Sequence, residues 1–354
     1  MRETGVLVVN AGSTTIKLAV FDGEERPVTA ATTATADLGG DMAVGLETLI
    51  RDVVGRVGAV GAVGAVGHRI VHGGDRFDGP VVIDDVVESA IGDIGALAPL
   101  HNTVALAGVR AARAAVGASV PHVAVFDTAF HRSIPASAST YGGPYGWIAA
   151  GLRRYGFHGI SHQDASEQAA AILGRPVQDL LMVTCHLGGG CSVTAVSGGR
   201  SIDTTMGFTP LDGLVMATRS GSLDPALVLH LLRRGASVDE VEALLEKGSG
   251  LLGLSGVSAG LRDVVAARDR GDARAGLAVD VFVHSVAAGV GAMIASLGGL
   301  DALVFTGGIG EHSAEVRTRV ADRFAFLGTP VLVVPAREDL TICRAVRRIL
   351  GSSV

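Results

Sequence analysis

The stretch from Val6 to Phe21, VLVVNAGSTTIKLAVF, predicts a strand, a polar turn and a second strand. Val6–Val9 is a short β-branched run typical of a buried strand, and Ile16–Phe21 resumes the pattern after residues 10–15. Asp22-Gly23 then supplies a hairpin turn. A P-loop would instead pass from its strand into a helix and end in Gly-Lys-Ser/Thr, which the sequence lacks. The sequence therefore argues against a P-loop enzyme.

A second stretch repeats this layout about half a chain later. Residues 180–199, LLMVTCHLGGGCSVTAVSGG, give a strand, a Gly-rich turn and a return strand. We interpret the two stretches as an internal duplication, with two similar halves facing a cleft. A third Gly-rich turn, residues 307–311, follows the strand predicted at Ala302–Thr306. Three such turns favour a phosphate-rich ligand, because glycine lets backbone N–H groups approach phosphate oxygens closely.

Shorter patterns predict further elements along the chain. The repeat GAVGAVGAVG at residues 58–67 is interpreted as a small-residue connection into a strand near residues 67–71. A strand at Val123–Phe126 ends at Asp127, where ligands gather in open α/β sheets. Helices are predicted over residues 103–117, 313–324 and 341–350. Together these elements indicate an α/β fold.

Composition narrows the class of protein. The 354 residues are 48% hydrophobic and 18% charged, which is enough to build a large core in one or two domains. A formal net charge of −6 argues against nucleic acid as the main partner. No uninterrupted run of about 18 apolar residues and no signal peptide is found, so we expect a cytoplasmic protein without a membrane anchor. The odd set Cys185, Cys191 and Cys343 fits a reducing compartment and small buried thiols.

Some polar residues stand out from this apolar background. Lys17 is one of only two lysines in a chain that otherwise uses arginine, and it falls in the second strand of the opening stretch. Arg69 lies in HRIVHGG, and Arg219 follows a polar stretch. Histidines also fall in short polar segments, where a structural role competes with a catalytic one; they are His101, His131, His158, His162 and His186.

A series of motifs runs along nearly the whole chain and contains these polar residues. The motifs are VNAGSTTIKLAVFD (9–22), GHRIVHGG (67–74), APLHN (98–102), VFDTAFH (125–131), YGFHGISH (155–162), HLGGGCSV (186–193), IDTTMGFTPLDGLVMATRSGSLDP (202–225), SGVS (255–258) and FTGGIGEHSAEVR (305–317). In these motifs and in their order the chain resembles the acetate kinase family. The longest match, residues 202–225, is highly specific, and PAREDL at 335–340 matches a terminal family motif more loosely.

The resemblance implies a fold and a reaction. The fold is the duplicated ribonuclease-H-like (actin/sugar-kinase-like) two-lobed α/β fold with a central cleft. Residues 1–130 with a C-terminal helix at 339–354 would form the N-terminal lobe. Residues 131–338 would form a lobe for nucleotide binding and dimerisation. The implied reaction is reversible phosphoryl transfer from ATP to acetate, giving acetyl phosphate and ADP, with Mg²⁺, in a homodimer.

The resemblance also assigns site residues by position. The implied catalytic residues are Asp127, Arg69, Arg219 and His158. Asn10 and Glu338 match the positions that hold Mg²⁺. Implied nucleotide-binding residues are Lys17, Ser13, Thr15, His186, Gly188, Gly189, Gly190, Arg262, Gly308, Gly310 and His312. Implied substrate contacts, including the niche for the acetate methyl group, are Arg69, Val71, Leu100, His101, Phe157 and Pro210.

Four departures from the family pattern keep alternatives open. Gly260 and Leu261 stand where the family usually has an Asp-Phe pair, and His312 stands where Asn is usual. The stretches from Asn10 to Arg69 and from Gly308 to Glu338 are shorter than usual. A propionate or broader short-chain acyl kinase, or a different phosphoryl donor, therefore stays open. A non-catalytic actin-like protein is the remote alternative.

Overall fold

We describe a computed structural model of the chain, covering residues 4–12, 15–39, 42–57, 62–95 and 99–351. Of the predicted site residues, Ser13 and the side chains of Leu100 and His101 lie outside the described parts. The chain divides into two compact units. Unit 1 comprises Met1–Arg132 with Arg337–Val354, and unit 2 comprises Ser133–Ala336.

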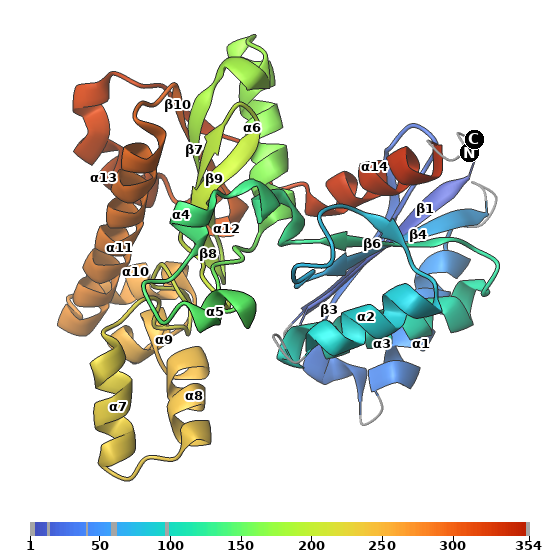
Figure 1. Cartoon of the computed structure of the whole chain (residues 1–354), viewed down its shortest axis with the longest axis horizontal. Coiled ribbons are helices and arrows are strands. Elements are labelled where there is room, and N and C mark those ends of the chain that lie inside the picture. Colours follow the sequence, from blue (N-terminus) through green and yellow to red (C-terminus); the bar gives the residue numbers. More distant parts are fainter. Residues whose placement is uncertain (1–3, 13–14, 40–41, 58–61, 96–98, 352–354) are drawn as a thin grey trace. The chain divides into compact units, whose positions relative to one another are not determined.

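Unit 1 is built on a mixed sheet with the strand order β3-β2-β1-β4-β6-β5 (Figure 1). The first three strands form an antiparallel meander, whereas β4 runs parallel to β1 and β6 parallel to β4. The predicted opening hairpin is thereby confirmed. The strand bounds are β1 Gly5–Ala11, β2 Thr15–Phe21, β3 Pro27–Ala34, β4 Val63–Ile70, β5 Val81–Val82 and β6 His122–Phe126.

Helices cover both faces of this sheet (Figure 1). On one face, side chains of α1 and α3 join Leu7 and Ile16 in a single apolar core. On the other face, α14 packs against β1 and β4. Gly67 permits this approach, since a Cβ atom there would lie 2.6 Å from Cγ2 of Ile342. The bounds are η1 Thr35–Leu38, α1 Met42–Gly55, α2 Asp85–Ile94, α3 Pro99–Val116, η4 Ala129–Ser133 and α14 Glu338–Gly351.

Unit 2 repeats the same sheet plan, in the order β11-β10-β7-β8-β9. Here β7, β8 and β9 form the antiparallel meander, and β10 lies parallel to both β7 and β11. Reading outward from β1 or β7, the two sheets match strand for strand apart from the short β5. This match confirms the predicted duplicated α/β fold. The bounds are β7 Leu181–Leu187, β8 Cys191–Ser197, β9 Arg200–Thr204, β10 Ala302–Thr306 and β11 Val331–Val333.

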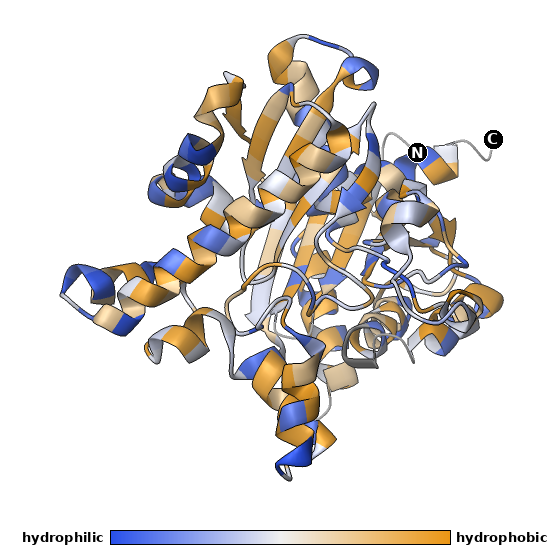
Figure 2. Cartoon of the chain, turned by 60° about the vertical axis from the view of Figure 1, so that its left-hand side comes forward, coloured by the Kyte–Doolittle hydropathy of each residue, from blue (hydrophilic) through white to orange (hydrophobic). Residues whose placement is uncertain are grey.

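The central helix of unit 2 is α11, which is both long and apolar. Its 25 residues would suffice in length and composition to cross a membrane, but half of its most apolar window is buried inside the protein. It packs on β8 and β7, as a core helix of a globular unit does (Figure 2). On its exposed side, Asp280 pairs with Arg319 at 2.6 Å. The helices are α4 Ala136–Ser139, α5 Gly146–Ala149, α6 Gly159–Leu173, η5 Val177–Asp179, α7 Pro225–Arg233, α8 Val238–Lys247, α9 Gly250–Ser255, α10 Leu261–Asp269, α11 Ala273–Leu297, α12 Gly307–His312, α13 Ala314–Ala321 and η6 Asp322–Leu327.

Four local predictions need correction. The repeat at 58–67 is not all connection, because β4 already begins at Val63 and pairs with β1; residues 58–61 lie outside the described parts. The third Gly-rich turn is itself the short helix α12. The helix predicted over 313–324 ends at Ala321, and a 3₁₀ turn follows. The last helix begins at Glu338, so this residue lies in a helical first turn.

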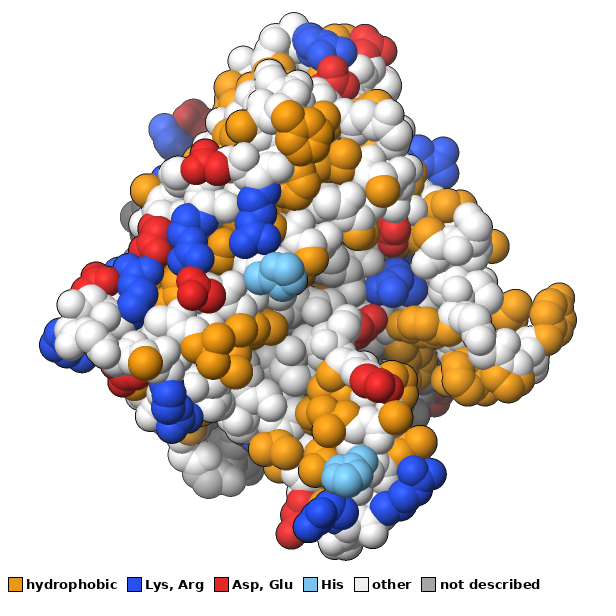
Figure 3. Space-filling model, turned by 90° about the vertical axis from the view of Figure 1, so that its left-hand side faces the viewer, with side chains coloured by type: hydrophobic (Ala, Val, Ile, Leu, Met, Phe, Trp, Pro, Cys, Tyr) orange, Lys and Arg blue, Asp and Glu red, His pale blue; other side chains and the backbone are white. Residues whose placement is uncertain are grey.

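The cysteines and the surface charge agree with the composition. Cys185, Cys191 and Cys343 are buried free thiols, and burial raises the pKa of Cys191 to about 12. On the face drawn in Figure 3, basic and acidic side chains are interspersed. That face therefore has no broad basic surface of the kind that binds nucleic acid.

Candidate active site

In unit 1, the carboxyl ends of β4 and β6 bring Arg69 and Asp127 together. Nε and Nη2 of Arg69 donate to the two carboxylate oxygens of Asp127 at 3.2 and 2.5 Å. Asp127 is fully buried, whereas the Arg69 side chain keeps 17% of its exposure. A bidentate pair of this kind fixes the plane of the guanidinium. Arg69 is thus held rigidly with donors to spare, because the residues that the structure describes accept hydrogen bonds from only three of its five N–H groups.

The electrostatics of this pair follow from its burial. Burial raises the pKa of the Asp127 carboxyl above its ordinary value, and the Arg69 charge opposes that shift. Burial disfavours the charge on Arg69, but the carboxylates of Asp127 and Glu338 outweigh it and raise the pKa of the guanidinium. Arg69 therefore stays cationic at any pH at which the protein is folded.

Asn10 joins the same cluster at the end of β1. Its Oδ1 accepts a 3.2 Å hydrogen bond from Nη1 of Arg69, and its Nδ2 donates to Oδ1 of Asp339 at 3.3 Å. Lys17 lies directly opposite Asn10 in the β1–β2 register, with an exposed side chain. Asp339 was not predicted; its only sequence signal is its place beside Glu338. The structure thus brings Asn10, Arg69 and Asp127 together and adds Asp339.

In unit 2, three predicted residues from distant segments converge on one turn. A methyl group built at Gly190 would lie 3.2 Å from Cε1 and Nε2 of His158 and 3.5 Å from Nη1 of Arg219. Arg219 is held by Glu246 at 3.3 Å and by the carbonyl oxygen of Pro210 at 3.2 Å. His158 sits at the start of α6 with φ 56°, a left-handed conformation unusual for a residue with a Cβ atom. Imidazole, guanidinium and a turn without side chains therefore share one small region.

His186 completes this region from the end of β7. Its ring stacks on His158 with centroids 4.3 Å apart, and its Nδ1 shares a 2.7 Å hydrogen bond with Oγ of Ser161. A Cβ atom at Gly188 would lie 3.8 Å from Nε2 of His186 and 4.0 Å from the backbone nitrogen of Gly308. The second and third Gly-rich segments therefore meet, because β10 lies beside β7 with Thr306 opposite His186. Gly189 is exposed at the tip of its turn.

A cavity of about 480 Å³ lies next to the third Gly-rich segment. Three predicted nucleotide residues, Arg262, Gly308 and His312, line it together with the departures Gly260 and Leu261. Gly310 does not line it: this residue is buried, and a Cβ atom there would lie 3.6 Å from the backbone of Phe305. This distance is an ordinary van der Waals contact, so Gly310 belongs to the packing of α12 on the sheet.

The predicted substrate residues are mostly recessed. Phe157 is 1% exposed and Val71 is 6% exposed, so both are packed into the core of their own unit. Pro210 is half-buried and holds Arg219 through its carbonyl group. Thr15 is half-buried at the start of β2.

The donor set of unit 1 suits a magnesium ion. Asn10 and Glu338 offer amide and carboxylate oxygens, which hard cations prefer. Within the described residues, no group of three or more His, Cys, Asp or Glu side chains could hold a metal ion. Mg²⁺ does not require such a cage, because it usually keeps several waters and binds one or two carboxylates together with substrate phosphates.

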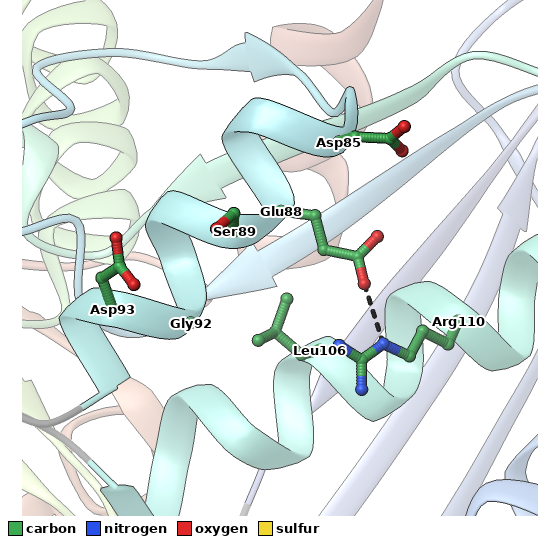
Figure 4. Close-up of a pocket in the computed structure, with 7 residues that line it drawn as sticks. All are labelled: Asp85, Glu88, Ser89, Gly92, Asp93, Leu106 and Arg110. Atoms are coloured by element: carbon green, nitrogen blue, oxygen red, sulfur yellow. Dashed lines mark hydrogen bonds and ion pairs between the residues drawn. The ribbon is translucent and has the colours of Figure 1, made fainter.

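A separate groove lies on unit 1 between α2 and α3 (Figure 4). Asp85, Glu88 and Asp93 line it, but Glu88 is already paired with Arg110 at 2.8 Å and Asp93 with Arg76 at 3.1 Å. These ion pairs account for two of the three carboxylates, so the groove offers little free charge to a ligand.

Comparison with known proteins agrees with this geometry. The model of the acetokinase family matches residues 29–338. An acetate kinase of Gloeobacter violaceus is 50% identical over 289 residues, covering 81% of this chain and 71% of that protein. An acetate kinase of Deinococcus deserti is 44% identical, covering 98% of each.

Solved structures give the same answer. The Porphyromonas gingivalis acetate kinase superposes with a TM-score of 0.88 at 32% identity, covering 98% of this chain and all of that chain. A Francisella tularensis propionate kinase gives a TM-score of 0.90 at 34% identity, with 98% and 99% covered. A Thermus thermophilus hexokinase shares the fold alone, at 16% identity and a TM-score of 0.52. The matched segment and these identities show that the chain belongs to the acetokinase family.

Proposed function

We propose that this protein is an acetate kinase, which transfers a phosphoryl group reversibly from ATP to the carboxylate of acetate. The observation that carries the proposal is the convergence of His158, Arg219 and Gly190 in unit 2. The guanidinium of Arg219, the imidazole of His158 and the backbone of the glycine turn can together donate hydrogen bonds to a phosphoryl group during its transfer. Phosphoryl transfer needs such positioning and charge stabilisation more than covalent chemistry.

In unit 1, Arg69 is proposed to bind the substrate carboxylate and the transferring group. Asp127 holds its guanidinium in plane through two hydrogen bonds and Asn10 accepts a third, so two of the five N–H donors are not used by the described residues and can bind substrate. Acetate is already ionised at neutral pH, so the reaction requires no base to remove a proton. Asp127 therefore supports the reaction by aligning Arg69. Lys17 supplies a compact positive charge for a nucleotide phosphate.

In unit 2, one cationic side chain and several neutral hydrogen-bond donors are proposed to contact the phosphate groups. His158 donates from its imidazole to an equatorial phosphoryl oxygen, and Arg219 stabilises the charge that this group carries. The turn Gly188–Gly190 with His186, and Gly308 with its neighbours, contacts nucleotide phosphates. The cavity lined by Arg262 and His312 takes the nucleoside.

Magnesium is proposed to bind at Asn10 and Glu338. When bound there, the ion would supply positive charge that neutralises the nucleotide phosphates. Arg69 fixes the Asn10 amide by donating a hydrogen bond to its Oδ1, and Asp339 fixes it by accepting a hydrogen bond from its Nδ2. Both contacts hold the amide in one orientation, which keeps its oxygen on a defined side.

A short-chain acyl kinase with broader specificity is the second candidate. The similarity to the Francisella propionate kinase favours it, and a pocket discriminates one methylene by only about 1–3 kcal/mol. Gly260, Leu261 and His312 line the proposed nucleoside cavity and depart from the family pattern, which is compatible with a phosphoryl donor other than ATP.

One experiment tests these proposals together. Acyl phosphate is trapped with hydroxylamine while the acid is varied among acetate, propionate and butyrate and the donor among ATP, GTP and pyrophosphate. We expect the highest kcat/KM with acetate and ATP, with propionate accepted at a lower rate. A higher kcat/KM for propionate would favour the second candidate. No product with any pair would contradict both and support a non-catalytic protein.

Unit 2 is also proposed to form a homodimer in the cytoplasm. None of the residues of α7 is buried, and its apolar side chains Leu227 and Leu229 are 49% and 48% exposed. Exposed apolar side chains mark association surfaces where they gather into a contiguous patch. Light scattering on the purified protein should give twice the mass of one chain, and Leu227→Glu should shift it toward the monomer.

A further inference from the structure

Behind His158, unit 2 contains a chain of hydrogen bonds that runs into its core. Nδ1 of His158 lies 2.9 Å from Oγ of Ser192, and the same oxygen lies 2.7 Å from Nε2 of His162. Nδ1 of His162 in turn lies 2.8 Å from Oγ1 of Thr184. Ser192, His162 and Thr184 are fully buried, on β8, α6 and β7 respectively (Figure 1).

We propose that Thr184, His162 and Ser192 form a directed relay that keeps His158 in the tautomer with its proton on Nε2. This inference rests on the proposed function, in which His158 donates a hydrogen bond to the transferring phosphoryl group. His162 and Thr184 are then positioning residues, since they act through Ser192 and touch no substrate.

The direction of the relay follows from counting protons. Each hydroxyl group has one proton, and each neutral imidazole has one protonated and one unprotonated nitrogen. In one direction Thr184 donates to Nδ1 of His162, Nε2 of His162 donates to Ser192, and Ser192 donates to Nδ1 of His158. The proton of His158 then sits on Nε2. In the opposite direction His158 donates from Nδ1 to Ser192, Ser192 donates to Nε2 of His162, and Nδ1 of His162 donates to Thr184. Nε2 of His158 then has a lone pair and no proton.

Thr184 decides between the two directions. Among the described residues, its buried hydroxyl has no hydrogen-bond partner other than Nδ1 of His162. In the opposite direction His162 would donate to Thr184, and the hydroxyl proton of Thr184 would be buried without an acceptor. Burying an unsatisfied donor is costly. The first direction satisfies all three buried donors and is therefore favoured.

The outer end of the relay has the matching geometry. Nε2 of His158 faces Gly190, where an added methyl group would lie 3.2 Å away and also 3.5 Å from Nη1 of Arg219. A lone pair on Nε2 would repel an anion at this place, whereas an N–H group attracts it. The left-handed backbone of His158 and its stacking on His186 hold the ring in the same orientation.

Nuclear magnetic resonance of the free protein tests the tautomer without substrate. The protein is labelled with ¹⁵N in its histidines, and the His158 signals are assigned by their loss in His158→Asn. We expect a protonated Nε2 and an unprotonated Nδ1 in the wild type. A protonated Nδ1 in the neutral ring would overturn the proposal. Because no turnover is involved, this result is independent of whether the hydroxylamine assay supports the proposed function.

Variants of Thr184 test the direction. Thr184→Val has the same shape but lacks the hydroxyl proton, so we expect the Nε2 tautomer to lose its preference and kcat to fall about tenfold. Because the substrate contacts stay in place, KM for acetate should be unchanged. Thr184→Ser, the matched control, should retain the wild-type tautomer and rate. A Thr184→Val protein with the wild-type tautomer and kcat would contradict the relay. Should this variant fail to fold, the wild-type spectrum alone decides.

Discussion

Unit 1 and unit 2 use the same sheet plan for different chemistry. In β1–β2 the second pair from the turn is Asn10 opposite Lys17, and in β7–β8 the corresponding second pair is His186 opposite Ser192. Unit 1 places an ion pair and an amide at its strand ends, whereas unit 2 places imidazoles, hydroxyls and glycines there. The duplication thus supplies equivalent positions, which hold charged side chains and an amide in unit 1 and imidazole and hydroxyl groups in unit 2.

The difference extends to how each unit holds its arginine. Arg69 pairs with the fully buried Asp127, while Arg219 pairs with Glu246, whose side chain is 24% exposed. A buried ion pair that loses one partner leaves an uncompensated charge, whereas a solvated pair loses little. Removing the Arg69 side chain should therefore lower both stability and activity, whereas removing the Arg219 side chain should lower activity alone.

Arg69→Ala is expected to have the largest effect. Turnover should fall on the order of 10³-fold, because a donor to the transferring group is lost. Unfolding free energy should fall by about 3–5 kcal/mol, because Asp127 becomes a buried unpaired carboxylate. Urea unfolding and steady-state rates measure the two effects.

The double variant Arg69→Ala/Asp127→Asn is the control for this coupling. Removing the buried charge should restore most of the stability and none of the turnover. Near-normal rates in Arg69→Ala would refute the role of Arg69, and a double variant as unstable as the single one would refute the electrostatic cause.

Arg219→Ala should lower turnover by a factor of about 10²–10³ while changing unfolding free energy by less than about 1 kcal/mol. Its ion pair with Glu246 is partly solvated, so little stability depends on it. Glu246→Gln is the matched control and should keep most of the activity. If Arg219→Ala unfolded as readily as Arg69→Ala, the contrast between the two units would not hold.

The contrast between units also shows what sequence can predict. Strand, turn and strand at residues 6–21 and 180–199 were readable because hydrophobic runs and glycine turns are local signals. Asp339 was missed because its partner Asn10 lies 329 residues away, and no local pattern encodes that contact. The sequence pattern groups His162 with other histidines in polar segments, yet this side chain is fully buried. Its partners Thr184 and Ser192 become visible only once α6 is packed on β7.

Gly190→Ala probes the unit 2 region more gently. Its methyl group would lie 3.2 Å from the His158 ring, tighter than ordinary contact, so the ring must shift by a few tenths of an ångström. We expect kcat to fall roughly tenfold, since catalysis is sensitive to small misplacements, with little change in stability. Gly189→Ala is a close control, because a methyl group there would meet nothing within 4 Å. Equal rates in the two variants would show that the His158 position is not critical.

The effect expected to be smallest on turnover concerns acid stability and belongs to unit 1. His68 and His122 are buried and stacked, with Nε2 of His68 2.8 Å from Nδ1 of His122. Burial, aided by the charge of Arg113, lowers the pKa of His122 to about 4, and burial together with His122 lowers the pKa of His68 well below 6.5.

In the unfolded chain these imidazoles have the ordinary pKa of 6.5, so between pH 6.5 and 4 the unfolded state binds more protons than the folded state. The contribution of these two histidines to the unfolding free energy should therefore be constant above pH 6.5. Below pH 6.5 the unfolding free energy should fall, by up to about 1.4 kcal/mol per pH unit for each histidine. Urea unfolding at pH 7.5, 6 and 5 measures the slope. His122→Asn removes one titrating ring and should make the slope shallower, whereas an unchanged slope would assign the acid sensitivity to other groups.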